Sequence, residues 1–268
     1  MDFSGKIAVV TGGASGIGLA SAHEFAQCNA AVAVLDRDAR AGQQVVTELC
    51  GKGQRADFFP VDVSRGAQVE KCVAEIVGRL GGIDILVNCA GIQRYASATT
   101  CSEEAWDEVM NVNLKSMFFT AKYAIPEMVK RGGGSIVNVG SVQSLAAVGN
   151  SVHYVTSKHG VLGLTRSLSM DYARQNIRAN CVLPGAIDTP LVRNVAAANP
   201  DPPGTLAACH RLQLRGTMGK PEEVARVIVF LASSLASLMT GAAVTVDGGL
   251  MVPAGGLGFD PGGSPVTR

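Results

Sequence analysis

Short apolar segments alternate with segments of helical spacing along most of this chain, and this alternation limits the possible folds more than any other feature. The apolar segments are rich in Val, Ile and Ala, and they are apolar throughout rather than at every second residue. A strand that is covered on both faces of a sheet needs such continuous apolar character. Seven segments are therefore expected to form strands: 7–11, 31–35, 56–59, 83–88, 135–139, 178–183 and 243–246.

The segments between these strands have apolar residues at the spacing of a helix. They cover residues 17–28, 39–50, 67–80, 102–130, 154–174 and 221–232. Pro221 is well placed for a first helical position, and two glutamates follow it, where the helix dipole favours acids. Strand and helix in repeated order imply right-handed crossovers. We predict an α/β fold with a single doubly wound, seven-stranded parallel sheet and helices on both faces, in one domain over residues 1–250.

Three segments need a separate interpretation. Residues 187–220 contain a Pro- and Gly-rich stretch and are expected to form a long irregular insertion that acts as a substrate lid. Residues 251–268 are rich in Gly and Pro without periodicity, which is typical of an extended or frayed tail. Residues 227–246 carry no charge and are long enough to span a bilayer, but hydroxyl residues and Gly241 interrupt them. We interpret them as a helix end, a turn and a strand.

Composition excludes several classes of protein. The formal net charge is +1 and no basic patch is visible, so neither nucleic acid nor a membrane is an expected partner. The apolar run near the N-terminus is too short for a secretory signal. The seven cysteines are an odd number without a Cys-x-x-Cys pair, which disfavours a disulfide framework and a structural metal site. A reduced, cytoplasmic location is expected.

A glycine-rich turn follows the first strand, in the sequence Thr11-Gly-Gly-Ala-Ser-Gly-Ile-Gly18. Without side chains the backbone can approach a pyrophosphate, which then faces the N-terminus of the next helix. The spacing is G-x-x-x-G-x-G rather than G-x-G-x-x-G, and the absence of Gly-Lys-Ser/Thr excludes a nucleoside-triphosphate P-loop. A tight turn between any strand and helix also favours glycine, so this motif alone is weak.

Acidic and amide residues follow the next strands, at the edge where parallel sheets bind ligands. Asp36 closes the second strand and could accept both ribose hydroxyls of NAD while repelling the phosphate of NADP. Arg37 could instead hold that phosphate, but the position of the carboxylate at the strand end favours NAD. Asp36 could also be only a turn or cap residue. Asp62 and Val63 follow the third strand, and residues 88–91 follow the fourth.

Tyr154 and Lys158 lie four residues apart on a predicted helix and therefore project from one face. The ammonium group should stabilise the phenolate and lower the tyrosine pKa toward neutrality, which would make the phenol a general base. Ser141 follows the fifth strand and could hydrogen-bond the substrate oxygen. Lys158 could reach the nicotinamide ribose, and Asn113 could hold a water that feeds protons to Lys158. A Tyr-x-x-x-Lys pair alone also occurs on many helices with a half-buried tyrosine.

In combination, these motifs resemble the short-chain dehydrogenase/reductase family over residues 5 to about 250. The matching pieces are Thr11-Gly-x-x-x-Gly-Ile-Gly18, Asp62, Asn88-x-Ala-Gly91, Asn113, Ser141, Tyr154-x-x-x-Lys158, Pro184-Gly185 with Thr189, and Asp247-Gly-Gly249. The resemblance implies a Rossmann fold, a nicotinamide cofactor and a catalytic tetrad of Asn113, Ser141, Tyr154 and Lys158. It also implies a homo-oligomer, commonly a tetramer, with helices 102–130 and 154–174 at the dimer contact. Cys89 departs from the family pattern, which usually has a second Asn there.

The expected contacts of the cofactor and of the substrate follow from these positions. The cofactor set is Gly12, Ser15, Gly16, Ile17, Gly18, Asp36, Arg37, Asp62, Val63, Asn88, Ala90, Gly91, Tyr154, Lys158, Pro184, Gly185, Ile187 and Thr189. The resemblance places Ile187 and Thr189 on the carboxamide side. The substrate set is Gln93, Ser141, Gln143, His153 and Tyr154. Its hydrogen-bonding groups favour a hydroxylated ring such as a sugar, polyol or cyclic diol.

The predicted function is NAD-dependent transfer of a hydride between the cofactor and a secondary alcohol or ketone, with a small molecule as substrate. One alternative is an NADPH-dependent ketone or 3-oxoacyl-carrier reductase, for which Arg37 rather than Asp36 would decide the cofactor. The other is a non-catalytic nucleotide-binding regulatory protein, and the presence of both Tyr154 and Lys158 speaks against it.

Overall fold

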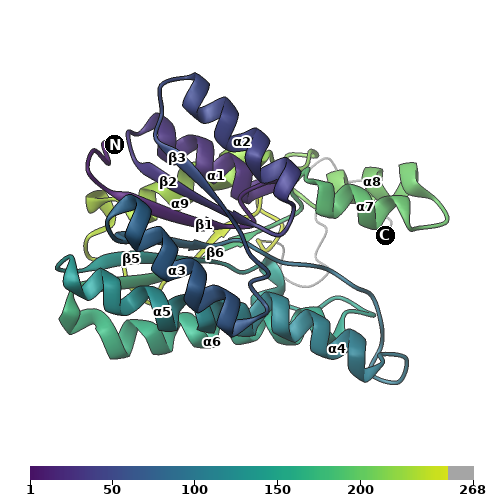
Figure 1. The fold of residues 1–268 in the computed structure, drawn as a ribbon. Coiled ribbons are helices and arrows are strands. Elements are labelled where there is room, and N and C mark those ends of the chain that lie inside the picture. Colours follow the sequence, from purple (N-terminus) through teal and green to yellow (C-terminus); the bar gives the residue numbers. More distant parts are fainter. Residues whose placement is uncertain (253–268) are drawn as a thin grey trace.

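A single parallel sheet of seven strands forms the centre of the computed structural model, which describes residues 1–252 (Figure 1). The strands are β1 (Ile7–Thr11), β2 (Ala31–Asp36), β3 (Ala56–Pro60), β4 (Ile85–Asn88), β5 (Gly134–Val139), β6 (Ile177–Pro184) and β7 (Ala243–Val246). They lie in the order β3-β2-β1-β4-β5-β6-β7. All seven strands expected from the apolar segments are present, and their ends differ from the expectation by at most two residues.

Helices cover both faces of the sheet. They are α1 (Gly16–Gln27), α2 (Ala39–Gly51), α3 (Gly66–Leu80), α4 (Glu103–Met110), α5 (Ser116–Lys130), α6 (Val152–Tyr172), α7 (Pro190–Ala197), α8 (Pro202–Arg211) and α9 (Pro221–Ala232). One apolar cluster joins the sheet to α1, α2 and α9, and a second joins its other face to α3, α5 and α6 (Figure 1). The predicted doubly wound α/β fold is confirmed.

The strand order reverses between β1 and β4, and this reversal positions the functional site. From β1 the chain builds outward through β2 and β3, and it then returns to the opposite side of β1 to add β4. The connections that leave β1 and β4 therefore diverge to opposite sides. In open parallel sheets the resulting crevice, at the carboxyl ends of the strands, is where ligands bind.

A chain of buried hydrogen bonds ties the central strands to the helices that cover them. Asn88 Nδ2 on β4 donates to Asn138 Oδ1 on β5 (2.8 Å), and Asn138 Nδ2 donates to Thr165 Oγ1 on α6 (2.9 Å). At the other end, Thr120 Oγ1 on α5 donates to Asn88 Oδ1 (2.7 Å). All four side chains are buried. Asn88 therefore fixes β4 against its neighbours from within the protein.

The segment expected as one helix over residues 102–130 contains a wider turn. A π-helical segment, Asn111–Lys115, joins α4 to α5. Such segments insert one extra residue per turn and are frequent at functional sites. Asn113 lies in this segment, where its Oδ1 accepts from the Ile92 backbone N–H (2.8 Å) and its Nδ2 donates to the Ile92 carbonyl (2.9 Å). The wide turn thus fastens the chain that follows β4.

The expectation that residues 187–220 form an irregular insertion is wrong, because the segment contains α7 and α8. Pro190, Pro202 and Pro203 stand in the first turns of these helices, where a missing N–H costs nothing. Thr189 caps the N-terminus of α7, and Asp201 caps the N-terminus of α8. The Asp201 carboxylate accepts a hydrogen bond from the Gly204 N–H (3.0 Å). Both helices project beyond the edge of the sheet (Figure 1).

Two further predictions concern the C-terminal part of the chain. Residues 227–246 form the end of α9, a short turn and β7, as the sequence indicated. Within the described range 1–252, no helix combines the length and apolar character needed to cross a membrane. The tail predicted at 251–268 lies outside the described residues except for its first two.

Candidate active site

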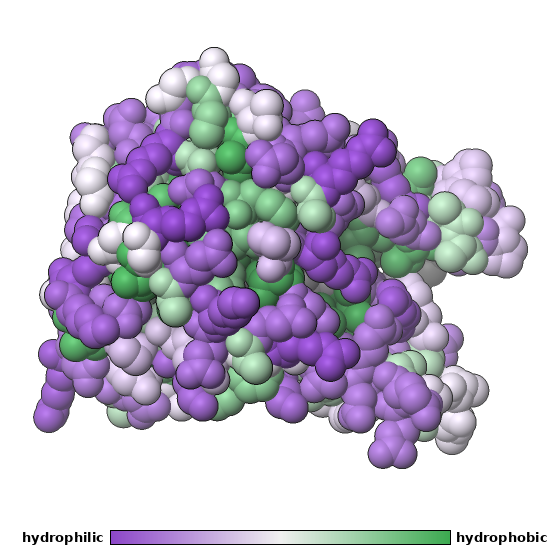
Figure 2. Space-filling model, viewed as in Figure 1, coloured by the Kyte–Doolittle hydropathy of each residue, from purple (hydrophilic) through white to green (hydrophobic). Residues whose placement is uncertain are grey.

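A cavity of about 480 Å³ lies at the carboxyl ends of the strands, beside the reversal of strand order. Its walls come from the chain that follows each of β1 to β6, and from α6, α7 and α8. In the space-filling view the surface is hollowed between the projecting α7–α8 segment and the part that carries α4, with hydrophobic residues at the base of that segment (Figure 2). Segments far apart in the sequence therefore meet around one space.

Most of the site residues predicted from the sequence line this cavity. They are Gly12, Ser15, Gly16, Ile17, Asp36, Arg37, Asp62, Val63, Ala90, Gly91, Gln93, Ser141, Gln143, Tyr154, Lys158, Pro184, Gly185, Ile187 and Thr189. Four predicted residues are not part of its lining: Gly18, Asn88, Asn113 and His153.

The glycine-rich turn at one end of the cavity has a geometry that side chains would block. Gly12 and Gly16 have φ angles of 64° and 52°, which disfavour other residues. A Cβ on Gly18 would lie 2.1 Å from the Gly12 carbonyl oxygen, so Gly18 acts by allowing α1 to pack against the turn. The Ser15 side chain makes no capping bond to α1. The N-terminus of α1 is thus suited to receive a diphosphate.

Asp36 is held at the end of β2 by the backbone around it. Its Oδ2 accepts from the Ala14 N–H (3.1 Å) and its Oδ1 accepts from the Asp38 N–H (3.0 Å). Each carboxylate oxygen still has a free lone pair, so the group can accept two further hydrogen bonds. Arg37 beside it is exposed to solvent. The residues of this end therefore fit a dinucleotide whose ribose offers two hydroxyl donors.

Three buried polar side chains meet at the other end of the cavity. Lys158 Nζ donates to the Val139 carbonyl (2.8 Å) and lies 5.6 Å from the centre of the Tyr154 ring. Ser141 Oγ accepts from the Gln143 N–H (3.1 Å), which leaves its own proton free to donate. The Ser141 hydroxyl, the Tyr154 phenol and the Lys158 amine thus line the same part of the cavity.

The electrostatics of this group correct one expectation from the sequence. Burial raises the pKa of Tyr154 to about 12, although the Ser141 hydroxyl acts in the opposite direction. Burial also lowers the pKa of Lys158 to about 8. The expected lowering of the tyrosine pKa by the ammonium group is therefore not found in the protein by itself. Removal of each group from water disfavours its charged form, and this is the largest cause of both shifts.

His153 and Asn113 support the cavity wall from behind. His153 is fully buried, its Nδ1 accepts from the Tyr154 N–H (2.9 Å), and burial lowers its pKa. Asn113 Nδ2 also donates to Ser157 Oγ (3.3 Å), and Ser157 lies one turn from Tyr154 on α6. His153 Nδ1 and the Asn113 amide are thus bonded to the backbone and to α6, and neither residue lines the cavity.

Sequence reasoning missed much of the substrate side. Tyr95 lines the cavity, and its hydroxyl accepts from Gln93 Nε2 (2.8 Å), so these two side chains form one polar wall. Many of the other lining residues that were missed are apolar, and they include Val148, Leu191, Val192, Val195, Cys209, Leu212 and Leu250. The spacing of Leu191, Val192 and Val195 is helical and could have revealed the inner face of α7.

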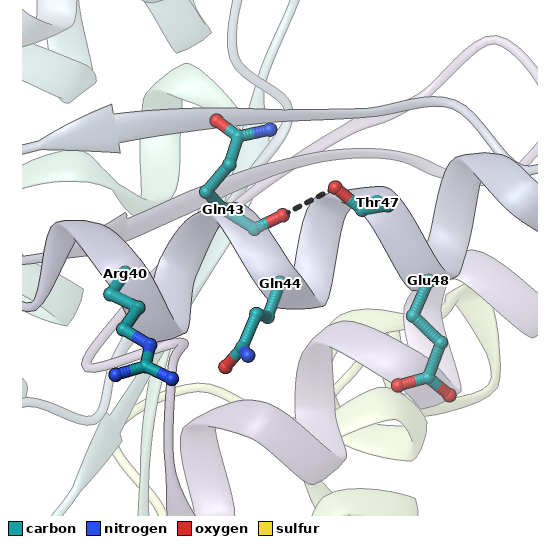
Figure 3. Close-up of a pocket in the computed structure, with 5 residues that line it drawn as sticks. All are labelled: Arg40, Gln43, Gln44, Thr47 and Glu48. Carbon is teal, nitrogen blue, oxygen red and sulfur yellow. Dashed lines mark hydrogen bonds between the residues drawn. The ribbon is translucent and has the colours of Figure 1, made fainter.

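A second depression lies on the outer surface and carries no comparable chemistry. Its five lining residues are Arg40, Gln43, Gln44, Thr47 and Glu48, and all of them come from α2 (Figure 3). Thr47 Oγ1 donates back to the Gln43 carbonyl (2.8 Å) within the same helix. Because all five lining residues within the described part of the chain belong to one helix, they describe a solvated helix surface.

Known proteins share both the sequence and the fold. The family model described as enoyl-(acyl carrier protein) reductase matches residues 12–251. The 3-oxoacyl-(acyl-carrier-protein) reductase FabG of Thermotoga maritima is 40% identical over 94% of this chain and 100% of its own length. Cyclohexanol dehydrogenase of Acinetobacter sp. is 36% identical over 92% of this chain and 95% of its own length. The crystal structure of levodione reductase superposes with a TM-score of 0.91 at 30% identity, over 94% of this chain and 100% of that one. The chain belongs to the short-chain dehydrogenase/reductase family of oxidoreductases, which act on small molecules with a nicotinamide cofactor.

Proposed function

We propose that this protein is an NAD-dependent short-chain alcohol dehydrogenase that interconverts a secondary alcohol and its ketone. One observation carries the proposal: Ser141, Tyr154 and Lys158 line the same cavity as the glycine-rich turn and Asp36. A dinucleotide with its diphosphate at α1 and its ribose at Asp36 would extend along this cavity toward the tyrosine. The two ends have the chemistry for binding and for proton transfer, respectively.

The protein's own groups would manage the proton and the charge on the substrate oxygen. NAD supplies the hydride acceptor, a positively charged nicotinamide ring, when it is bound. In its phenolate form, Tyr154 takes the proton of the alcohol at its phenolic oxygen, and Ser141 donates a hydrogen bond to the substrate oxygen. Lys158 in its charged form stabilises the phenolate, which its place one helical turn away allows. Asn113 acts as a positioning residue, because its amide holds Ile92 and Ser157.

Asp36 supports NAD rather than NADP as the cofactor. The carboxylate is fixed by two backbone N–H groups and would repel a 2′-phosphate, while it can accept from two hydroxyls. The runner-up, an NADPH-dependent ketone or 3-oxoacyl-carrier reductase, is favoured by exposed Arg37 at the cavity edge and by the relative from Thermotoga maritima. The two assignments differ in which nucleotide the unmodified protein prefers.

The substrate we propose is cyclic, with one or more further hydroxyl or carbonyl groups. Gln93, Gln143 and the Tyr95 hydroxyl supply hydrogen-bonding groups on one side of the cavity, and the side chains of α7 and α8 supply an apolar wall. A ring with polar substituents on one edge matches both surfaces. The name of the relative from Acinetobacter, cyclohexanol dehydrogenase, supports a cyclic substrate.

We also propose the setting in which this site works. Residues 1–250 act as one dehydrogenase domain, and residues 187–220 form its lid. The protein assembles as a homo-oligomer, and exposed apolar side chains such as Phe118 on α5 and Met170 on α6 support helix contacts between copies. All seven cysteines are free thiols, which supports a reduced compartment such as the cytoplasm.

The variant Tyr154→Phe tests the proposal directly. NAD⁺ binding, followed by calorimetry, should stay within about twofold, because the ring still fills its place. Turnover of a responsive secondary alcohol, followed by nicotinamide absorbance, should fall by roughly 10²–10⁴-fold, the usual contribution of a general base. Tyr123→Phe on α5, which does not line the cavity, is the matched control. Unchanged turnover in Tyr154→Phe would rule out the mechanism.

A further inference from the structure

The first turn of α6 carries Tyr154, and the backbone N–H groups of such a turn have no carbonyl partner within their own helix. The Val152 N–H donates instead to the Ala96 carbonyl of another segment (3.2 Å). The Tyr154 N–H donates to Nδ1 of the His153 side chain (2.9 Å). The main chain of the reacting tyrosine is therefore held by an imidazole.

The residue that would ordinarily cap this turn does not do so. Ser151 stands at the N-cap position, where a serine hydroxyl usually accepts from one of the first N–H groups. Its φ and ψ angles of −137° and 34° differ from the extended conformation typical of a cap, and its side chain makes no capping bond. His153 therefore takes over the function of the cap for the N–H of the residue that reacts.

This contact fixes the chemical form of the imidazole. A ring nitrogen accepts a hydrogen bond only when it carries no proton, so His153 must be neutral with its proton on Nε2. His153 is fully buried, and burial lowers its pKa, which favours the neutral form. The charged groups that act on it, Arg94 and Glu108, form an ion pair with each other (3.0 Å) and shift its pKa in opposite directions.

The other ring nitrogen speaks against a role in stability alone. Nε2 is buried and has no hydrogen-bond partner among residues 1–252. A buried N–H donor without a partner lowers stability, which an apolar side chain at this place would avoid. Contact with a ligand does not account for His153 either, because it is not among the residues that line the cavity. Its one hydrogen bond between side chain and protein runs to the backbone of Tyr154.

We propose that His153 is a positioning residue for the reaction: by accepting a hydrogen bond at Nδ1 it holds the main chain of Tyr154, and with it the phenol, where the proton is transferred. The inference rests on the proposed function, because it concerns the same tyrosine. A displacement of reacting groups by about 1 Å can lower a rate by about 10²-fold. Loss of this bond should therefore lower kcat while the protein stays folded.

Two variants that each keep the place of one ring nitrogen test this role. His153→Asn keeps an acceptor, Oδ1, at the place of Nδ1, whereas the polar group of His153→Gln lies one bond further out, near the place of Nε2. For a responsive secondary alcohol, kcat should fall by at least about tenfold in His153→Gln and by less than about threefold in His153→Asn. KM for NAD⁺ should stay constant in both, and thermal unfolding reports whether each variant is folded. His159→Asn, at an exposed position of α6, is the matched control and should leave kcat unchanged.

Nuclear magnetic resonance tests the same bond without turnover. In protein labelled with ¹⁵N-histidine, the ring nitrogen shifts show which nitrogen carries the proton, and His153→Asn identifies the His153 signal among the four histidines. We expect a proton on Nε2 and none on Nδ1. In protein labelled with ¹⁵N-tyrosine, the Tyr154 amide signal should move far more in His153→Gln than in His153→Asn.

A proton on Nδ1 of His153 would overturn the proposal. So would a loss of kcat in His153→Asn as large as in His153→Gln, or no loss in either variant. If the nitrogen and amide signals behave as expected but the parent oxidises no alcohol, the hold on the Tyr154 main chain stands and the proposed function fails.

Discussion

Lys158 donates its ammonium group to the carbonyl of Val139, 2.8 Å away, at the end of β5. This bond holds the amine beside the Tyr154 ring and also away from water, since both side chains are buried. A carbonyl dipole compensates a buried ammonium only in part, which is why the pKa of Lys158 falls to about 8. The group that supports the chemistry is therefore placed there at a cost in stability.

Replacing this amine should make the protein more stable near neutral pH. The folded-state pKa of Lys158, about 8, lies below its ordinary value of 10.5. The unfolded chain binds the proton more tightly, so the penalty is complete below pH 8 and disappears as the pH rises toward 10.5. Lys158→Met should gain up to about 3 kcal/mol at pH 7. Urea unfolding at pH 7 and pH 10.5 measures the gain, which should shrink at the higher pH.

Lys122 on α5 is exposed, so Lys122→Met is the control for this pair of measurements. The difference in unfolding free energy between this variant and the parent should be nearly the same at both pH values. An advantage of Lys158→Met that is equal at both pH values would show that packing, and not the buried charge, is its cause.

The cofactor preference should depend on Asp36. Asp36→Ala removes an acceptor for two ribose hydroxyls, and charge-assisted hydrogen bonds contribute about 1.5–3 kcal/mol each. KM for NAD⁺ should rise by at least about tenfold, and KM for NADP⁺ should fall because the repulsion is gone. Steady-state kinetics with both nucleotides provide the measurement. Asp38→Ala, which removes only the cap of α2, should leave the ratio of the two KM values unchanged. A parent protein that prefers NADP⁺ would contradict the assignment.

The buried amide chain should be sensitive to the loss of its middle member. Asn138→Leu leaves the amide of Asn88 without its acceptor in the interior of the sheet. An unsatisfied buried polar group costs about 1–3 kcal/mol, so the denaturant midpoint should fall clearly without a change of slope. Thr47→Val, which removes an exposed hydroxyl on α2, should change stability by less than about 0.5 kcal/mol. Equal effects of the two variants would show that water already satisfies the buried amide.

Of two glycine-to-alanine variants, one should weaken cofactor binding and the other should stabilise the protein. In Gly18→Ala the new Cβ would meet the Gly12 carbonyl oxygen at 2.1 Å, so the turn must move and NAD⁺ binding should weaken by at least about tenfold, or 1.4 kcal/mol. Gly78→Ala in α3 meets no atom within 4 Å and should stabilise the protein by about 0.5–1 kcal/mol. For both variants, calorimetry measures NAD⁺ binding and thermal unfolding measures stability. Normal binding by Gly18→Ala would contradict the close packing of α1 on the turn.

The residues alone were enough to predict the seven strands and the helices that cover the sheet, because strands buried on both faces and helices with one apolar face each have a local period. They did not predict α7 and α8, whose prolines suggested irregular structure. The sequence also predicted that the glycine turn, Asp36 and the Tyr154–Lys158 pair would lie at one edge, since the carboxyl ends of parallel strands meet there. The wide turn at Asn113, the burial of His153 and the high pKa of Tyr154 became visible only in the folded protein. Those properties depend on which distant segments pack together and exclude water, and no local period records that.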